Sequence, residues 1–294
     1  MATAQFGRVI TAMITPFTED GAVDYESAVA LAKHLVAHGS EGLLVGGTTG
    51  EGATMTAEEK LKLYTLIVDA VGKRGEGKKV PVMGNIGTIS TADTIAFGNK
   101  AKETGIDCAL VIVPFYVKPN QEGMYQHFTA VAKGVDLPLV LYNVPGRTGV
   151  SIQPETIKRI VDECPNVVGI KDATGSWDQV TKEKALLPED FMIYSGDDAF
   201  TLPVLLAGGV GIISVSAHVI GDDMLAMVDA FEKGDLAKAR ELHLKMYEIN
   251  KGMFFTASPT PVKTATNLVG QPGGHFRLPM VEPTEAEKAK VRQM

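Results

Sequence analysis

The stretch Leu139–Lys171 reads LVLYNVPGRTGVSIQPETIKRIVDECPNVVGIK and shows the unit that repeats along this chain. Each end is a short apolar run, which is typical of a buried strand, and the longer amphipathic run Pro154–Glu163 lies between them. Strands that are apolar throughout, rather than alternating with polar residues, fit a parallel sheet that is covered on both faces. The stretch therefore predicts a strand–helix–strand unit of a parallel sheet.

The same alternation of strand and helix occurs about eight times along the chain. We expect strands at Val9–Ile14, Gly42–Val45, Val80–Met83, Cys108–Val113, Leu139–Tyr142, Val167–Lys171, Phe191–Ser195 and Gly211–Val215. We expect helices at Tyr25–His38, Ala57–Val71, Thr91–Glu103, Gln121–Lys133, Pro154–Glu163, Trp177–Leu187, Ala199–Leu206 and Asp222–Lys233.

Two architectures fit such repeated units, an open doubly wound sheet and a closed (β/α)8 TIM barrel. A barrel takes about 250 residues, and the eighth expected helix ends close to that length, which favours the barrel. We assign residues 1–234 to the catalytic barrel and residues 235–294 to a C-terminal helical extension packed on it. The extension should contain the helices Leu236–Lys251, Pro261–Leu268 and Pro283–Arg292.

The composition of the 294-residue chain narrows the classes of partner. A net charge of −7 argues against a nucleic-acid binder, which would need a basic face. No apolar run reaches the ~18 residues of a membrane span, and the first residues lack the pattern of a signal peptide. Cys108 and Cys164 are far apart, and each lies in or next to a strand-like run. We therefore expect reduced, buried thiols in a cytoplasmic protein.

Lys171 ends the apolar run Val167–Lys171, where a charged side chain is unusual because its desolvation is costly. Such a lysine either caps an exposed strand end or has its charge suppressed, so that the free amine can attack a carbonyl. Tyr142 ends the preceding strand, one βα repeat of about 30 residues earlier. Neighbouring barrel strands end at the same rim, so the two side chains should lie side by side. A phenol there could carry the protons of a Schiff-base reaction.

Other strand ends carry further polar residues. The glycine-rich loop Gly46–Gly52 is either a tight βα turn or a site whose two hydroxyls and backbone N–H groups bind a small carboxylate. Arg147, after the fifth strand, is either solvated or positioned to bind a carboxylate through paired hydrogen bonds. Asp197 and Asp198 precede a helix, which favours capping or loop bracing over a metal pair. The histidines show no metal-binding spacing.

Seven motifs, in order along nearly the whole chain, resemble the dihydrodipicolinate synthase and N-acetylneuraminate lyase superfamily of pyruvate-dependent class I aldolases. They are GGTTGE (Gly46–Glu51), PFY (Pro114–Tyr116), YNVPGRTG (Tyr142–Gly149), GIKDATG (Gly169–Gly175), SGDD (Ser195–Asp198), GGVGIISV (Gly208–Val215) and PTPVK (Pro259–Lys263).

The resemblance implies a role for each matching residue. Lys171 forms the Schiff base with pyruvate and Tyr142 relays protons, while Thr48 connects Tyr142 to Tyr116 of a neighbouring subunit. The carboxylate of pyruvate is held by Thr49 and by the backbone of the same loop, which includes Gly50, and the backbone of Ile213 lies against the substrate. Arg147 receives the carboxylate of the second substrate.

Arg147 also selects within the superfamily, because aldolases that act on sugar acids typically lack an arginine there. It favours the dihydrodipicolinate synthase branch, which condenses pyruvate with L-aspartate 4-semialdehyde to supply diaminopimelate and lysine synthesis. This chemistry needs no metal and no organic cofactor, since the lysine itself supplies the electron sink. The resemblance also implies a homotetramer built as a dimer of dimers, and at least a dimer if Tyr116 is shared. Two alternatives stay open: another pyruvate-dependent aldolase, such as N-acetylneuraminate lyase or a keto-deoxy sugar-acid aldolase, and a non-catalytic pyruvate-binding paralogue.

Many relatives are inhibited by lysine at a cleft between subunits, and this chain departs from their pattern. The corresponding places are Ala57, Lys60, Ala92 and Phe115, so a carboxylate and a phenol are lost and a cation is gained. We therefore predict weak or absent inhibition by lysine, because a cationic ligand loses its partners and meets a like charge. Kinetics at increasing lysine concentration test this, and strong inhibition at sub-millimolar lysine would contradict it.

Overall fold

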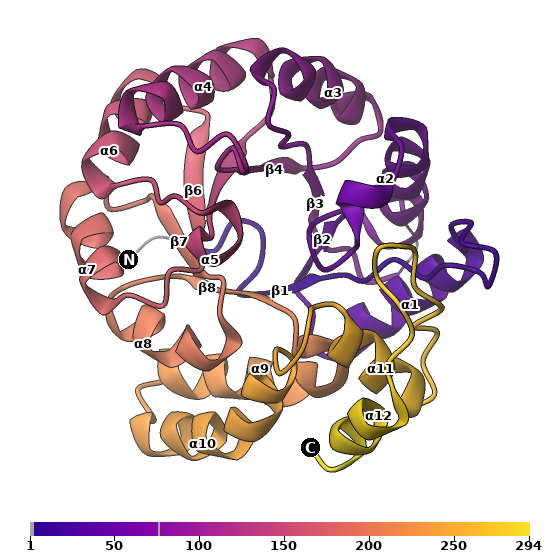
Figure 1. The fold of residues 1–294 in the computed structure, drawn as a ribbon. Helices are drawn as coiled ribbons and strands as arrows, with labels where there is room; N and C mark the ends of the chain where they lie inside the picture. The colour runs from indigo at the N-terminus through magenta and orange to yellow at the C-terminus, as the bar shows by residue number, and fades with distance from the viewer. Residues whose placement is uncertain (1–2, 76) are drawn as a thin grey trace.

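The computed structural model describes residues 3–75 and 77–294, and its centre is a closed barrel of eight parallel strands (Figure 1). The strands pair in chain order and β8 pairs with β1, so the predicted (β/α)8 barrel is confirmed and the open sheet is excluded. They are β1 (Val9–Ala12), β2 (Gly42–Val45), β3 (Val82–Asn85), β4 (Cys108–Ile112), β5 (Leu139–Asn143), β6 (Val167–Asp172), β7 (Met192–Ser195) and β8 (Gly211–Ser214).

Helices surround the barrel and continue past it at the C-terminal end of the chain (Figure 1). They are α1 (Tyr25–Ala37), α2 (Ala57–Val71), α3 (Thr91–Glu103), α4 (Gln121–Gly134), α5 (Pro145–Thr148), α6 (Pro154–Glu163), α7 (Trp177–Leu186), α8 (Thr201–Leu206), α9 (Ala217–Glu232), α10 (Leu236–Gly252), α11 (Thr260–Leu268) and α12 (Glu285–Arg292), with 3-10 turns η1 (Gly52–Thr54) and η2 (Asp198–Phe200). Within the described ranges, no helix is long and apolar enough to cross a membrane.

Five helices that follow strands, α1, α2, α3, α4 and α7, begin at polar capping residues. Asp24, Thr56, Ser90, Asn120 and Ser176 each accept a hydrogen bond from a backbone N–H in the first turn of the next helix. Such caps satisfy donors that have no partner inside the helix. In these five places the caps mark the point at which the loop turns from the rim of the barrel into a helix.

Two apolar layers follow from the alternation of side chains along each strand. One alternate set, which includes Ile10, Leu44, Met83 and Val140, packs inside the barrel, while the other packs against the helices. Cys108 and Cys164 are buried free thiols, as predicted. Tyr142 and Tyr194 belong to the interior layer, and Lys171 pairs with both of them across neighbouring strands. Lys171 therefore also belongs to the set that faces the inside of the barrel.

Several predicted boundaries were wrong, for physical reasons. The third strand begins at Val82, after Pro81, which has no N–H to give to the sheet. The expected helix Ala199–Leu206 is a 3-10 turn followed by α8. Helix α9 begins at Ala217, five residues earlier than expected, and the non-helical angles of Ile220 (φ −131°, ψ 31°) interrupt it.

Candidate active site

Lys171 and Tyr142 lie side by side at the ends of β6 and β5. The two residues are direct partners in the register of the sheet, and Lys171 Nζ lies 4.5 Å from the centre of the Tyr142 ring. Both side chains are buried, with 5% and 7% exposed. The predicted contact at the rim is confirmed, and the alternative of a lysine that caps an exposed strand end is excluded.

Burial changes the charge of Lys171. Desolvation lowers the pKa of its ammonium to about 8, although the negative charge of Asp198 raises it and the positive charge of Arg147 lowers it further. Ion pairs between described residues include none with Lys171. A substantial fraction of this amine is therefore neutral near pH 8, which is the form that attacks a carbonyl.

Tyr142 remains a phenol at ordinary pH. Burial raises its pKa to about 12, and the charge of Arg147 and a hydrogen bond with Thr48 oppose this increase. The Thr48 side chain is exposed at the rim, whereas that of Thr49 is buried. A protonated phenol that shares a hydrogen bond with a hydroxyl can pass protons to and from a neighbouring group.

Asp198, in η2, has a buried carboxyl group that accepts three hydrogen bonds from residues at the end of β8 and just after it. It accepts hydrogen bonds from the Ser214 hydroxyl and from the backbone N–H groups of Val215 (3.0 Å) and Ser216 (3.3 Å). Burial raises its pKa to about 6, against the effect of these bonds. Asp197 caps η2 by accepting from the N–H of Ala199 at 2.9 Å. The predicted capping and bracing roles of this aspartate pair are confirmed.

The loop Gly46–Gly52 folds tightly between β2 and η1. A Cβ at Gly52 would lie 1.9 Å from the Gly46 carbonyl oxygen, and one at Gly50 would lie 2.8 Å from the Met13 carbonyl oxygen. The Gly50 carbonyl accepts a hydrogen bond from Thr15 Oγ1 at 2.7 Å. The structure therefore packs the predicted site residue Gly50 against the end of β1, and it places Thr48 and Thr49 at the rim.

Arg147 is exposed on the short helix α5, in a segment expected to be a loop. It lines a cavity of about 360 Å³ at the rim, together with Tyr142, Asp197 and Lys251. Lys251 comes from α10, so the C-terminal extension contributes to the mouth of the site. The charge of Arg147 acts on both Tyr142 and Lys171.

Ile213 and Tyr116, the two remaining predicted site residues, differ in burial. Ile213 is fully buried in β8 and belongs to the interior layer of the barrel. Tyr116 is 87% exposed and has a positive φ of 65° in the loop after β4. Among the described residues, no hydrogen bond of this single chain joins Tyr116 to Thr48 or Tyr142.

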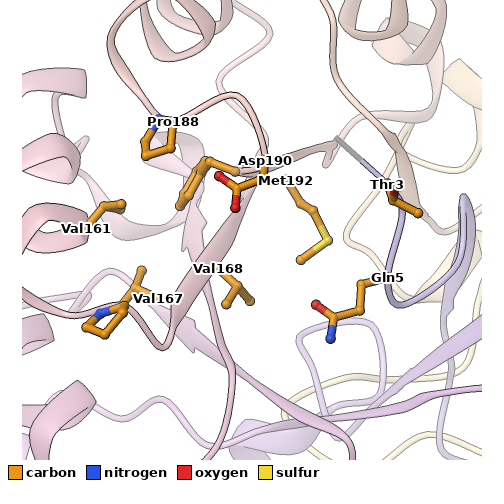
Figure 2. A pocket seen from close by; sticks show the side chains of 10 residues that line it. Thr3, Gln5, Val161, Val167, Val168, Pro188, Asp190 and Met192 are labelled. Carbon is orange, nitrogen blue, oxygen red and sulfur yellow. The ribbon is translucent and has the colours of Figure 1, made fainter. Parts of the chain in front are cut away.

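Another cavity, of about 560 Å³, lies at the opposite end of the barrel. Figure 2 shows it beside the starts of β6 and β7, with Val167, Val168 and Met192 among its lining residues. Asp190 and Gln5 contribute polar side chains to its lining, and Lys171 is not among its lining residues. Active sites of such barrels form at the C-terminal ends of the strands, so this cavity is not our candidate.

The described residues contain no group of three or more His, Cys, Asp or Glu side chains that could hold a metal ion. The aspartates at the rim are instead occupied by the protein's own hydroxyl and N–H groups. The chemical groups gathered at the rim are an amine, a phenol, two threonine hydroxyls and a guanidinium.

A sequence model of the dihydrodipicolinate synthetase family matches residues 5–294. The chain belongs to this family. A relative named 4-hydroxy-tetrahydrodipicolinate synthase from Heliobacterium modesticaldum is 48% identical over 290 residues, covering 99% of this chain and 95% of the relative. A crystal structure of a dihydrodipicolinate synthase from Bacillus anthracis is 43% identical, with a TM-score of 0.94 over 100% of this chain and 98% of that one.

A third structure is described as the first monomeric dihydrodipicolinate synthase variant. It is 38% identical, has a TM-score of 0.93, and covers 98% of this chain and 95% of its own. Membership of the family agrees with the resemblance seen in the seven sequence motifs. The relatives that this chain resembles are lyases of a biosynthetic pathway.

Sequence reasoning missed the contacts that hold the site in place. Asn143 exchanges hydrogen bonds with Ser151 and Ile152 and so braces the segment that includes α5 and Arg147. Glu51 and Lys263 form a buried ion pair although they are far apart in the sequence. Glu51 ends the motif GGTTGE and Lys263 ends the motif PTPVK, but no local pattern shows that the two residues meet.

The lowered pKa of Lys171 predicts how its reactivity depends on pH. Competitive reductive methylation, read by peptide mass spectrometry, should show half-maximal labelling of Lys171 near pH 8. In Asp198→Asn the inflection should move to lower pH, because the charge that raises the pKa is removed. An inflection near the ordinary lysine value of about 10.4 would contradict the prediction.

Proposed function

We propose that this chain is a 4-hydroxy-tetrahydrodipicolinate synthase, a lyase that condenses pyruvate with L-aspartate 4-semialdehyde. The observation that carries the proposal is a buried lysine with a pKa of about 8, placed against a protonated phenol at the C-terminal rim of a barrel. The names of the relatives, at 45% to 48% identity over nearly the whole chain, point to the same reaction.

The reaction begins when the neutral amine of Lys171 attacks the keto carbon of pyruvate. The resulting carbinolamine loses water to give a protonated Schiff base, whose positive nitrogen is an electron sink. Loss of a methyl proton then gives an enamine, which attacks the aldehyde carbon of the semialdehyde. The amine of the second substrate finally displaces Lys171 and closes the ring. This sequence requires neither a metal nor an organic cofactor, because the lysine supplies the electron sink.

Tyr142 carries protons through these steps. Its hydroxyl shares a hydrogen bond with Thr48, which extends the path for protons toward the mouth of the site. We assign Thr49 and the backbone of the Gly46–Gly52 loop to the carboxylate of pyruvate, with the Ile213 backbone against the substrate. Glycines allow that backbone to approach a ligand closely.

Arg147 gives the specificity for the second substrate. Its guanidinium faces the cavity that also contains Asp197 and Lys251, so a substrate with a carboxylate and an amine fits the charges there. A sugar aldehyde, which carries hydroxyl groups in place of a carboxylate, would leave Arg147 unpaired. We therefore favour the semialdehyde over the polyol substrates of N-acetylneuraminate lyase and keto-deoxy sugar-acid aldolases.

The same proposal includes the assembly and the location of the chain. Tyr116, which is 87% exposed here, would complete the hydroxyl chain of a neighbouring subunit in a dimer or in a tetramer of two dimers. We place the enzyme in the cytoplasm, where its two free thiols stay reduced. We retain residues 1–234 as the catalytic barrel and 235–294 as its extension, a division that falls between α9 and α10.

Borohydride trapping tests the central step. Wild-type protein treated with pyruvate and borohydride should gain one reduced pyruvyl group on Lys171, located by peptide mass spectrometry. Lys263 is an internal control, because it is also buried but is paired with Glu51, and it should stay unmodified. No adduct, or an adduct on another lysine, would transfer support to the non-catalytic pyruvate-binding alternative.

Substitution of Arg147 tests the second substrate. Arg147→Ala should lower kcat/KM for the semialdehyde by roughly 10- to 100-fold, the value of one charge-assisted pair at about 1.5–3 kcal/mol. The KM for pyruvate should change less than threefold. Arg159→Ala is the control, since that exposed arginine of α6 pairs with Glu122 and does not line the cavity. An unchanged semialdehyde KM, together with turnover of sugar aldehydes, would favour the sugar-acid aldolases.

A further inference from the structure

A buried ion pair connects the C-terminal extension to the loop that carries Thr48 and Thr49. Lys263 Nζ, on α11, donates to Glu51 Oε1 at 2.6 Å, and the two side chains are 0% and 2% exposed. Lys263 also donates to the carbonyl oxygen of His275. Removing one partner of a buried pair leaves a desolvated charge, so such a pair strongly favours a single arrangement of the segments it joins.

Glu51 combines a buried carboxylate with an unusual backbone conformation. Its φ of 52° and ψ of 29° are left-handed, a conformation unusual for a residue with a side chain. Its N–H donates to the Thr48 carbonyl at 3.1 Å, and its own carbonyl accepts from the Thr54 N–H at 3.0 Å. Glu51 therefore closes the turn that contains Thr48 and Thr49, and its carboxylate anchors that turn.

Arg277 adds a second connection from the same C-terminal segment. The backbone N–H of Arg277 donates to Glu51 Oε2 at 3.3 Å, and its guanidinium donates to the Thr54 carbonyl at 2.9 Å. The guanidinium also binds both carboxylate oxygens of Glu59, in the first turn of α2, at 2.8 and 2.9 Å. The chain from Glu51 to Glu59 is thus held at both ends by residues that follow α10. Figure 1 shows this yellow segment beside α1 and α2.

We infer that Glu51, Lys263 and Arg277, together called the C-terminal clamp, are positioning residues for the carboxylate of the keto acid. None of them contacts Lys171 or Tyr142 in the described structure; they act through the Gly46–Gly52 loop. This inference rests on the proposed function, in which that loop holds the carboxylate of pyruvate. It gives these residues of the extension an indirect role in substrate binding, through the loop, in addition to packing on the barrel.

The test compares two probes that differ only in the carboxylate, pyruvate and its neutral analogue pyruvamide. Each is trapped on Lys171 with borohydride over a range of concentrations. In Glu51→Gln, half-saturation for pyruvate should rise at least tenfold, while that for pyruvamide changes less than twofold. Equal losses for both probes, or an unchanged value for pyruvate, would overturn the inference, because a general structural role would not distinguish them.

Two further variants separate positioning from folding. Glu51→Gln leaves the Lys263 charge buried and unpaired, so the double variant Glu51→Gln/Lys263→Met removes both charges. It should recover thermal stability toward that of the wild type and still bind pyruvate weakly. Glu41→Gln is the matched control. It breaks the ion pair between Glu41 and Arg8, the residue just before β1. It should lower stability without changing pyruvate binding. A double variant with wild-type affinity for pyruvate would overturn the inference.

Hydrogen–deuterium exchange makes failure of the clamp distinguishable from failure of the proposed function. Backbone amides of residues 46–54 should exchange at least tenfold faster in Glu51→Gln than in wild type, whatever substrate the enzyme uses. If wild type formed no pyruvate adduct, the proposed function would fail, and the exchange data would still decide whether the clamp orders the loop. Unchanged exchange in this segment would overturn the clamp even where wild type traps pyruvate.

Discussion

The site depends on Lys171, which is buried and has no ion-pair partner among the residues that the structure describes. Chemistry at Lys171 requires a neutral amine, and its desolvation inside the barrel supplies one by lowering the pKa to about 8. Lys263 is also buried, and burial lowers its pKa too, but Glu51 at 2.6 Å raises the pKa and pairs with the ammonium. The same residue type therefore serves two purposes in one chain. Lys263 gives a fixed connection between segments, and Lys171 gives a reactive nitrogen.

The residues around Lys171 keep its amine from forming an ion pair. Asp198 is close enough for its charge to raise the pKa of Lys171, yet its oxygens accept hydrogen bonds from Ser214, Val215 and Ser216. Those bonds hold the carboxylate to the end of β8 and keep it from pairing with the amine. Tyr142 faces the amine with a neutral phenol instead. The strand register that aligns Tyr142 with Lys171 thus decides which group the amine meets.

The sequence predicted the parts of this arrangement that follow from strand order. Uniformly apolar runs indicated parallel strands, and the spacing of Tyr142 and Lys171 by one repeat indicated neighbouring strand ends. Both predictions are confirmed by the closed barrel and its register. Helix α5 was missed because Pro145 and Gly146 indicate a turn. The early start of α9 was missed because the irregular backbone at Ile220 interrupts its helical pattern.

Contacts between distant segments were beyond sequence reasoning for a different reason. Glu51 and Lys263 carry no periodic or spacing signal, because their meeting depends on where the C-terminal extension packs beside the barrel. A left-handed glutamate in a glycine-rich turn is stable only if its surroundings determine it. The carboxylate of Glu51 therefore needs the cation from α11, and that cation needs a carboxylate in order to be buried. This mutual requirement explains why the barrel alone does not account for the geometry of its own substrate loop.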